Sequence, residues 1–187
     1  WPKEIPRQSI EELLTLSFIE EAANVVFVSS SGLGKTMIAK NIGLQAVLSG
    51  YGVLFTDASD LLTDLGACES PAIYKRRLSH YVRPRLLIID EVGYLSHSAK
   101  TADILFQVIS KRHEQSSTIV TTNKAFKEWG TVFPGSACIF ALVDRLTHRS
   151  EIICIDGDSY RRKQTDDRQI EKNRKQKTSS QQRKDTP

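Results

Sequence analysis

A run of small residues that ends in lysine and threonine is the clearest chemical signal in the sequence. It follows the apolar segment 25–28 and comprises Ser29, Ser30, Ser31, Gly32, Leu33, Gly34, Lys35 and Thr36. Glycines in such a loop let successive backbone N–H groups surround phosphate oxygens, and the start of the following helix adds favourable positive charge. The run therefore predicts a P-loop, in which Lys35 reaches the β and γ phosphates of ATP and the Thr36 hydroxyl binds Mg²⁺. The expected nucleotide-binding residues are Ser31, Gly32, Leu33, Gly34, Lys35 and Thr36.

The first position of this P-loop departs from the usual pattern GxxxxGK[ST], because it is Ser29 instead of glycine. A side chain there would cost about 1 kcal/mol if the backbone needs a conformation that only glycine adopts easily. It would cost almost nothing if the backbone does not need that conformation. Ser29 therefore bears on how tightly the loop would bind nucleotide. The assignment of the loop as a P-loop is less affected.

A second signal is an apolar segment that ends in two acids. Residues 86–89 are Leu-Leu-Ile-Ile, and Asp90 and Glu91 follow them. Ligands bind at the carboxyl ends of parallel strands, so we expect Asp90 to hold Mg²⁺ through water. We expect Glu91 to polarise a water molecule for attack on the γ phosphate. The pair predicts ATP hydrolysis, and the alternative is a solvated acidic turn at the end of a strand.

Two further side chains are candidates on weaker grounds. Asn123 follows the apolar segment 118–122, where its amide could hold the attacking water or the γ phosphate, although an Asn after a strand is usually a turn residue. Arg145 lies in an expected helix before the last strand. From the residues alone, Arg145 either pairs with Asp144 or a neighbouring helix, or projects into the nucleotide of another subunit as an arginine finger.

These residues must be positioned by alternating strands and helices. Short, β-branched apolar runs predict five strands near 25–28, 52–56, 86–89, 118–121 and 152–155. Helical spacing of apolar residues predicts helices at 10–22, 35–48, 102–112 and 138–148, and another that Ser70 caps and Pro71 opens. The alternation predicts an α/β fold with a five-stranded parallel sheet between helices.

Composition narrows the class of protein. The 187 residues are 40% hydrophobic and 26% charged, which suits one globular core, and no apolar stretch approaches the roughly 20 residues of a membrane span. The three widely spaced cysteines, Cys68, Cys138 and Cys154, form no CxxC pair. We therefore expect a cytoplasmic protein without a zinc site, and no contact with a membrane.

The basic charge is concentrated at the C-terminus. The net charge is +4, but residues 161–187 contain ten Lys or Arg and four Asp or Glu, which leaves 16 basic and 18 acidic residues in 1–160. With one aliphatic residue, this tail is expected to be disordered or conditionally helical, and either solvated or in contact with a polyphosphate backbone. The expected organisation is an N-terminal segment 1–23, an ATP-binding core 24–160 and a basic tail 161–187. The start at Trp1 suggests a fragment.

The motifs in this order resemble the IstB-like ATPases, helper proteins of insertion-sequence transposition, and their relatives the DnaC helicase loaders. The resemblance runs from about residue 10 to 163, and its most specific parts are DEVGYL at 90–95 and LFQVISKRHEQSSTIVTTN at 105–123. It implies the AAA+ class with an ASCE-type sheet. It also implies Walker A roles for Lys35 and Thr36, Walker B roles for Asp90 and Glu91, sensor I for Asn123, and an arginine finger acting in trans for Arg145.

The resemblance further implies the partners. A helper of this family would form an ATP-dependent homo-oligomer on duplex DNA, with little sequence preference, and would assist a transposase. Candidate DNA contacts are Lys75, Arg76 and Arg77, although three neighbouring bases are more often a solvated helix face. Two alternatives share the motifs: a loader of the replicative helicase, and a nucleotide-binding scaffold that no longer hydrolyses ATP.

Overall fold

The computed structural model describes residues 6–93 and 99–157. Its strands are β1 (Asn24–Val28), β2 (Val53–Asp57), β3 (Leu86–Val92), β4 (Ser117–Thr122) and β5 (Ser150–Cys154). They form one sheet in the order β2-β3-β4-β1-β5, and every neighbouring pair is parallel. The predicted five-stranded parallel α/β sheet is confirmed.

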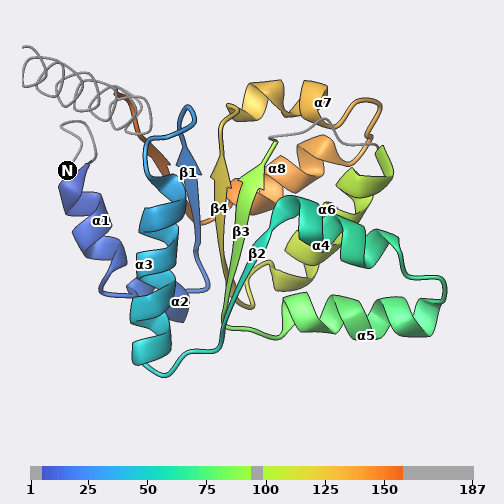
Figure 1. Ribbon diagram of the computed structural model, residues 1–187, viewed down its shortest axis with the longest axis horizontal. Helices are drawn as coiled ribbons and strands as arrows, with labels where there is room; N and C mark the ends of the chain where they lie inside the picture. Colours follow the sequence, from blue (N-terminus) through green and yellow to red (C-terminus); the bar gives the residue numbers. More distant parts are fainter. Residues whose placement is uncertain (1–5, 94–98, 158–187) are drawn as a thin grey trace, which may run out of the picture.

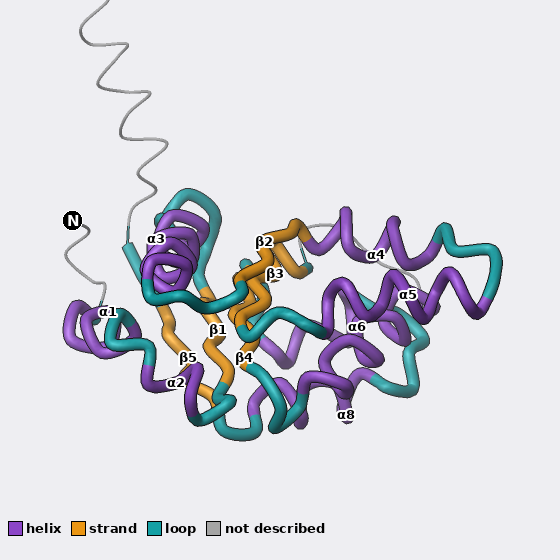
Figure 2. The backbone as a smooth tube through the Cα atoms, turned by 90° about the horizontal axis from the view of Figure 1, so that it is seen from below, coloured by secondary structure: helices purple, strands orange, loops and turns teal. Residues whose placement is uncertain are grey.

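Helices cover both faces of the sheet (Figures 1 and 2). They are α1 (Arg7–Leu13), α2 (Ser17–Glu20), α3 (Lys35–Leu48), α4 (Ala58–Gly66), α5 (Pro71–Val82), α6 (Ala99–Arg112), the 3₁₀ turn η1 (Phe126–Glu128), α7 (Trp129–Val132) and α8 (Ile139–Thr147). The first three lie on one face, and α4 to α8 lie on the other. In the two described stretches of chain, no helix is long and apolar enough to cross a membrane.

Alternation along each central strand explains the two layers of core. In β3, Leu86 and Ile88 pack with α1, α2 and α3, whereas Leu87 and Ile89 pack with the helices of the other face. All four are at most 1% exposed. A strand that is covered on both faces must be apolar at successive positions, because side chains alternate between the faces. This explains why the strands were visible in the sequence as continuous apolar runs.

Two helices begin where local signals predicted. The helix after the P-loop spans Lys35–Leu48 as expected, and α5 begins at Pro71 with the Ser70 hydroxyl accepting a hydrogen bond from the Ile73 N–H at 3.3 Å. The apolar periodicity did not predict α4, η1 or α7. The last strand begins at Ser150, two residues before the expected start.

The expected single helix over 10–22 is wrong. The chain instead forms α1 and α2, separated by Leu16 at φ 67° in the left-handed region. The Thr15 hydroxyl donates to the Glu12 carbonyl at 2.7 Å, a local bond that competes with continuation of the helix. The change of direction lets Leu16 and Ile19 both be buried in the core under α3.

A buried arginine lies at the side of the sheet where the strands begin. The Arg112 side chain at the end of α6 is 1% exposed. Its guanidinium donates to the carbonyls of Tyr81, Val82, Pro84 and Ser117 and to the Thr118 hydroxyl. Burial lowers the pKa of Arg112 to about 10, so it remains protonated at neutral pH. One side chain thus joins the end of α6 to the turn before β3 and to the start of β4.

We expect Arg112→Met to lower the free energy of unfolding by about 2–4 kcal/mol, because it leaves several buried carbonyl groups without a donor. Urea denaturation followed by circular dichroism measures the change. The matched control is Lys111→Met on the same helix, where the side chain is exposed and the expected change is within about 0.5 kcal/mol. Equal stability of the two variants would contradict the role given to Arg112.

Candidate functional site

The carboxyl ends of three strands meet at one edge of the sheet. β4 lies between β1 and β3, so the segments that follow Val28 and Thr122 and the last residues of β3 are neighbours in space (Figure 1). These segments carry the P-loop, the pair Asp90 and Glu91, and Asn123. Parallel pairing therefore gathers side chains that are up to 94 residues apart in the chain, as between Ser29 and Asn123.

The P-loop turns through two left-handed glycines. Gly32 and Gly34 have φ of 89° and 90°, a region that side chains rarely adopt. A Cβ atom built on Gly34 would meet no atom within 4 Å, so backbone conformation rather than space requires glycine there. Lys35 follows as the first residue of α3 and is buried, and its Nζ donates to the Ser29 carbonyl at 2.7 Å and to the Ser30 carbonyl at 2.9 Å.

Ser29 occupies the first position of the P-loop without the conformational cost that a glycine-only site would impose. It is not among the residues with positive φ. Its N–H donates to the Thr122 carbonyl at 3.2 Å, which continues the pairing of β1 with β4, and its hydroxyl accepts from Lys35 at 2.9 Å. The serine is therefore part of the hydrogen bonding that holds Lys35.

Two threonine hydroxyls hold the Asp90 carboxylate. Thr36 at the start of α3 donates to Asp90 Oδ1 at 3.1 Å, and Thr121 on β4 donates to the same oxygen. Asp90 is 3% exposed. A buried carboxylate costs much free energy unless it is hydrogen bonded, so these contacts make the position tolerable. They also place Thr36 and Asp90 side by side although 54 residues separate them.

Glu91 lies at an irregularity in the sheet. The register of β3 with β4 shifts between Ile89 and Val92, and Glu91 has φ 60°. Its N–H donates to the Thr121 hydroxyl at 2.9 Å, while its side chain is exposed. A non-glycine residue in the left-handed region is held there by its surroundings, and such residues occur often at functional sites. The shift turns Glu91 out of the sheet while Asp90 stays buried.

Asn123 and Arg145 have different surroundings. The Asn123 Oδ1 atom is buried and has no hydrogen-bond partner among the described residues. Arg145 on α8 donates to the Ser110 hydroxyl, and its guanidinium lies 4.6 Å from the centre of the Phe106 ring. In the single chain Arg145 therefore contacts the neighbouring helix α6, which was one of the alternatives left open by the sequence, rather than Asp144.

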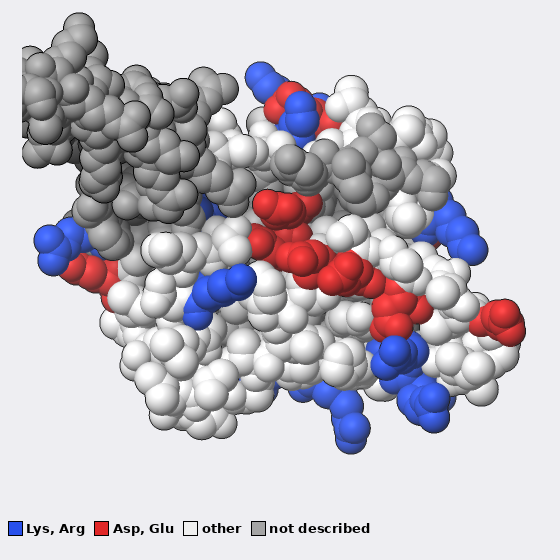
Figure 3. Space-filling view, viewed as in Figure 1, with Lys and Arg blue, Asp and Glu red and all other residues white. Residues whose placement is uncertain are grey.

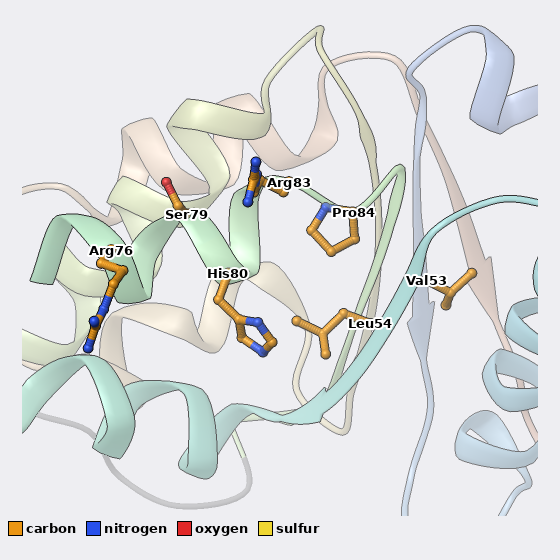
Figure 4. A pocket seen from close by; sticks show the side chains of 7 residues that line it. All are labelled: Val53, Leu54, Arg76, Ser79, His80, Arg83 and Pro84. Atoms are coloured by element: carbon orange, nitrogen blue, oxygen red, sulfur yellow. The ribbon is translucent and has the colours of Figure 1, made fainter. Parts of the chain in front are cut away.

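The three basic residues of α5 are all exposed but differ in their contacts. Arg77 forms an ion pair with Asp64 of α4 at 2.9 Å. Arg76 lines a pocket between α5 and the edge strand β2, together with Val53, Leu54, Ser79, His80, Arg83 and Pro84 (Figure 4). The third base, Lys75, is exposed and forms no ion pair with any residue that the structure describes.

Charge is unevenly distributed on the surface. Figure 3 shows acidic side chains in a band that crosses the middle of one face, whereas Lys and Arg side chains are scattered over the face and its outline, several of them at the lower margin on the side where Figure 1 places α5. Acidic residues at the end of β2 and along α4 are Asp57, Asp60 and Asp64. A polyanion would be repelled by this band and attracted to the margin.

The parallel sheet and these loops define an α/β domain of the P-loop type. Solved structures share this fold: the replication initiator DnaA bound to AMPPCP and single-stranded DNA superposes with a TM-score of 0.67 at 20% identity, covering 81% of this chain and 45% of that one. The DnaC helicase loader superposes with a TM-score of 0.57 at 20% identity, covering 80% and 87%. At this level of identity the likeness concerns the fold.

Sequence similarity identifies the family. Residues 2–168 match the family described as IstB-like ATP binding protein, and the chain belongs to this family. It is 41% identical over 157 residues to an insertion sequence IS5376 ATP-binding protein of Geobacillus stearothermophilus, covering 84% of this chain and 62% of that protein. It is 36% identical to the corresponding IS21 protein of Pseudomonas aeruginosa, covering 86% and 60%. The chain thus spans about three fifths of the length of these relatives.

Thr121 is the site residue that sequence reasoning missed. Its single hydroxyl contacts both the Asp90 carboxylate and the Glu91 N–H. A threonine in a β-branched strand is unremarkable by type, because such residues are frequent in strands. A polar side chain two residues before Asn123, on the strand that Asn123 follows, was the signal that could have indicated it.

We expect Thr121→Val to lower the free energy of unfolding by about 1–3 kcal/mol, because the nearly isosteric valine removes a hydrogen bond to a buried carboxylate. Thermal or urea unfolding measures this. In the control Thr56→Val, the lost hydroxyl donates only to the adjacent Asp57 carbonyl at 3.2 Å on the edge strand, and the expected change is within about 0.5 kcal/mol. A Thr121 variant as stable as the control would contradict the proposed support of Asp90.

Proposed function

We propose that the chain binds ATP with Mg²⁺ and hydrolyses it, as part of a helper protein that assembles on duplex DNA and assists a transposase. The observation that carries the ATP proposal is the contact between the Thr36 hydroxyl and the Asp90 carboxylate at 3.1 Å, directly beside the buried Lys35. This is the arrangement of oxygen ligands and lysine that a nucleotide bound to a metal ion requires.

The donor set suits Mg²⁺. A hydroxyl and a carboxylate oxygen lie next to each other, and Mg²⁺ prefers hard oxygen ligands supplemented by water and phosphate. Thr36 and Asp90 would hold the ion, which would neutralise part of the phosphate charge. Lys35 would exchange its contacts with the Ser29 and Ser30 carbonyls for phosphate oxygens.

Hydrolysis would depend on two residues beside the phosphates. Glu91, turned out of the sheet at the register shift, would orient and deprotonate the attacking water. The buried Oδ1 of Asn123 has no partner among the described residues and is available to accept a hydrogen bond from that water. Glu91 lies near the end of β3 and Asn123 directly follows the adjacent strand β4, which limits their relative movement.

Similarity favours a role in transposition over the loading of a replicative helicase. The relatives with identities of 34–41% are ATP-binding proteins of insertion sequences, whereas the DnaC loader shares the fold at 20% identity. Duplex DNA would contact the side of α5 and the following turn that carry Arg76, His80 and Arg83 (Figure 4), because the acidic side chains of α4 disfavour a polyanion. Contacts of this kind would read the phosphate backbone more than the base sequence.

The first test is ATP turnover with and without duplex DNA at low salt. We expect Lys35→Ala to lose nucleotide binding, because the phosphates lose their cation. We expect Glu91→Gln to keep nucleotide binding while turnover falls by about 10²–10⁴, because the amide cannot take a proton. Stimulation by DNA is expected to decline steeply as salt rises.

The control for this test is Glu12→Gln, an exposed acid on α1 that should leave turnover unchanged. Nucleotide binding without turnover in the unaltered chain would instead indicate a scaffold that does not hydrolyse ATP. DNA-stimulated turnover that persists in Glu91→Gln would contradict the assignment of the base.

Arg145 is proposed to act on the nucleotide of a neighbouring subunit. We expect Arg145→Ala to bind ATP but to lose turnover by roughly 10³. The decisive measurement is the turnover of a mixture of Arg145→Ala and Lys35→Ala subunits. An interface in which the Arg145→Ala subunit supplies the nucleotide site and the Lys35→Ala subunit supplies the arginine should recover activity. Unmixed samples of each variant are the controls, and a mixture as inactive as they are would show that Arg145 does not act in trans.

A further inference from the structure

Two turns meet at the edge of the sheet opposite the P-loop. One turn joins α6 to β4 and carries His113 and Glu114, and the other joins α8 to β5 and carries His148. Both turns precede strands of the same parallel sheet. The turns are therefore separated from the proposed nucleotide site by the length of these strands, and no step proposed for ATP uses their side chains.

The three side chains converge. Among the residues that the structure describes, they form a group in which one ligand atom from each lies within 4.8 Å of the others. Glu114 Oε1 is 3.7 Å from His148 Nδ1, and the centres of the two imidazole rings are 5.1 Å apart. His113 and His148 are 35 residues apart in the chain. They are two of its four histidines, so half of its imidazoles lie together here.

The backbone of both turns is well anchored. The N–H groups of Gln115 and Ser116 both donate to the Arg112 carbonyl, at 2.9 and 3.0 Å, and Arg112 is the buried arginine that closes this edge. On the other turn, the His148 N–H donates to the Asp144 carbonyl at 2.9 Å. The Cα positions of the three residues are thus held, while the side chains of Glu114 and His148 are each 50% exposed and can rotate.

We propose that His113, Glu114 and His148 form a binding site for a divalent transition-metal ion of the zinc class. Two imidazole nitrogens and one carboxylate oxygen are ligands that Zn²⁺ accepts with a fourth position left to water. Tetrahedral zinc needs ligand atoms about 3.3 Å apart, given bonds of roughly 2.0–2.1 Å, so modest side-chain rotation would close the present spacing. Imidazole disfavours Mg²⁺, which separates this site chemically from the one beside Thr36 and Asp90.

A bound ion would join the end of α8 to the end of α6. These helices already contact each other through Arg145, which lies three residues before His148, and through Ser110, which lies three residues before His113. The ion would hold α8 in the position in which Arg145 rests on α6. The metal site itself stands whether or not the chain hydrolyses ATP.

The test is Zn²⁺ binding to the full chain, freed of metal by a chelator and free of nucleotide, measured by isothermal titration and by thermal unfolding. We expect one ion per chain and a rise in the midpoint of unfolding. His113→Asn, His148→Gln and Glu114→Gln should each weaken binding by at least about tenfold. The matched control is His80→Asn, an exposed histidine on α5 that should leave the affinity unchanged.

Cobalt distinguishes this site from the free thiols of Cys68, Cys138 and Cys154. Co²⁺ bound by two imidazoles and a carboxylate should give visible absorption without strong thiolate charge-transfer bands in the near ultraviolet. Thiolate bands, no saturable binding, or equal affinity in His148→Gln and in the unaltered chain would each overturn the proposal. Because all the substituted side chains are at least partly exposed, circular dichroism should show unchanged folding in every variant.

Discussion

Parallel pairing of β4 with β1 on one side and β3 on the other is the constraint on which the candidate site depends. The pairing holds the three strands in register over most of their length, and helices cover both faces. When helices cover both faces of a parallel sheet, polar side chains can gather only where the strands begin or where they end. The P-loop, the two acids and Asn123 are gathered at the carboxyl edge for this reason.

This arrangement carries a desolvation cost at Asp90. Its carboxylate lies on an apolar strand and is almost completely buried. The fold offsets the cost with hydroxyl groups from two other elements, Thr36 from α3 and Thr121 from β4. The same Thr121 hydroxyl also accepts the N–H of Glu91, where the strand leaves its register. One side chain thus supports a buried acid and the exposed acid beside it.

The opposite edge is organised around a cation. Arg112 satisfies carbonyl groups of three segments, and the turns that carry His113, Glu114 and His148 lie beside it. Helices α6 and α8 run between the two edges, and Arg145 connects them. A structural change at either end of α8 would therefore alter the position of Arg145, the residue proposed to act between subunits.

The sequence by itself determined the five strands, the P-loop and the helix Lys35–Leu48, because apolar runs and glycine-rich turns act through neighbouring residues. It also placed Asn123 directly after a strand, whereas β3 continues past Asp90 to Val92. Only the tertiary structure decided the left-handed break at Leu16, the shared hydroxyl of Thr121 and the position of Arg145 on α6. Those features depend on which side chains from distant segments occupy the same space, and no local pattern specifies that.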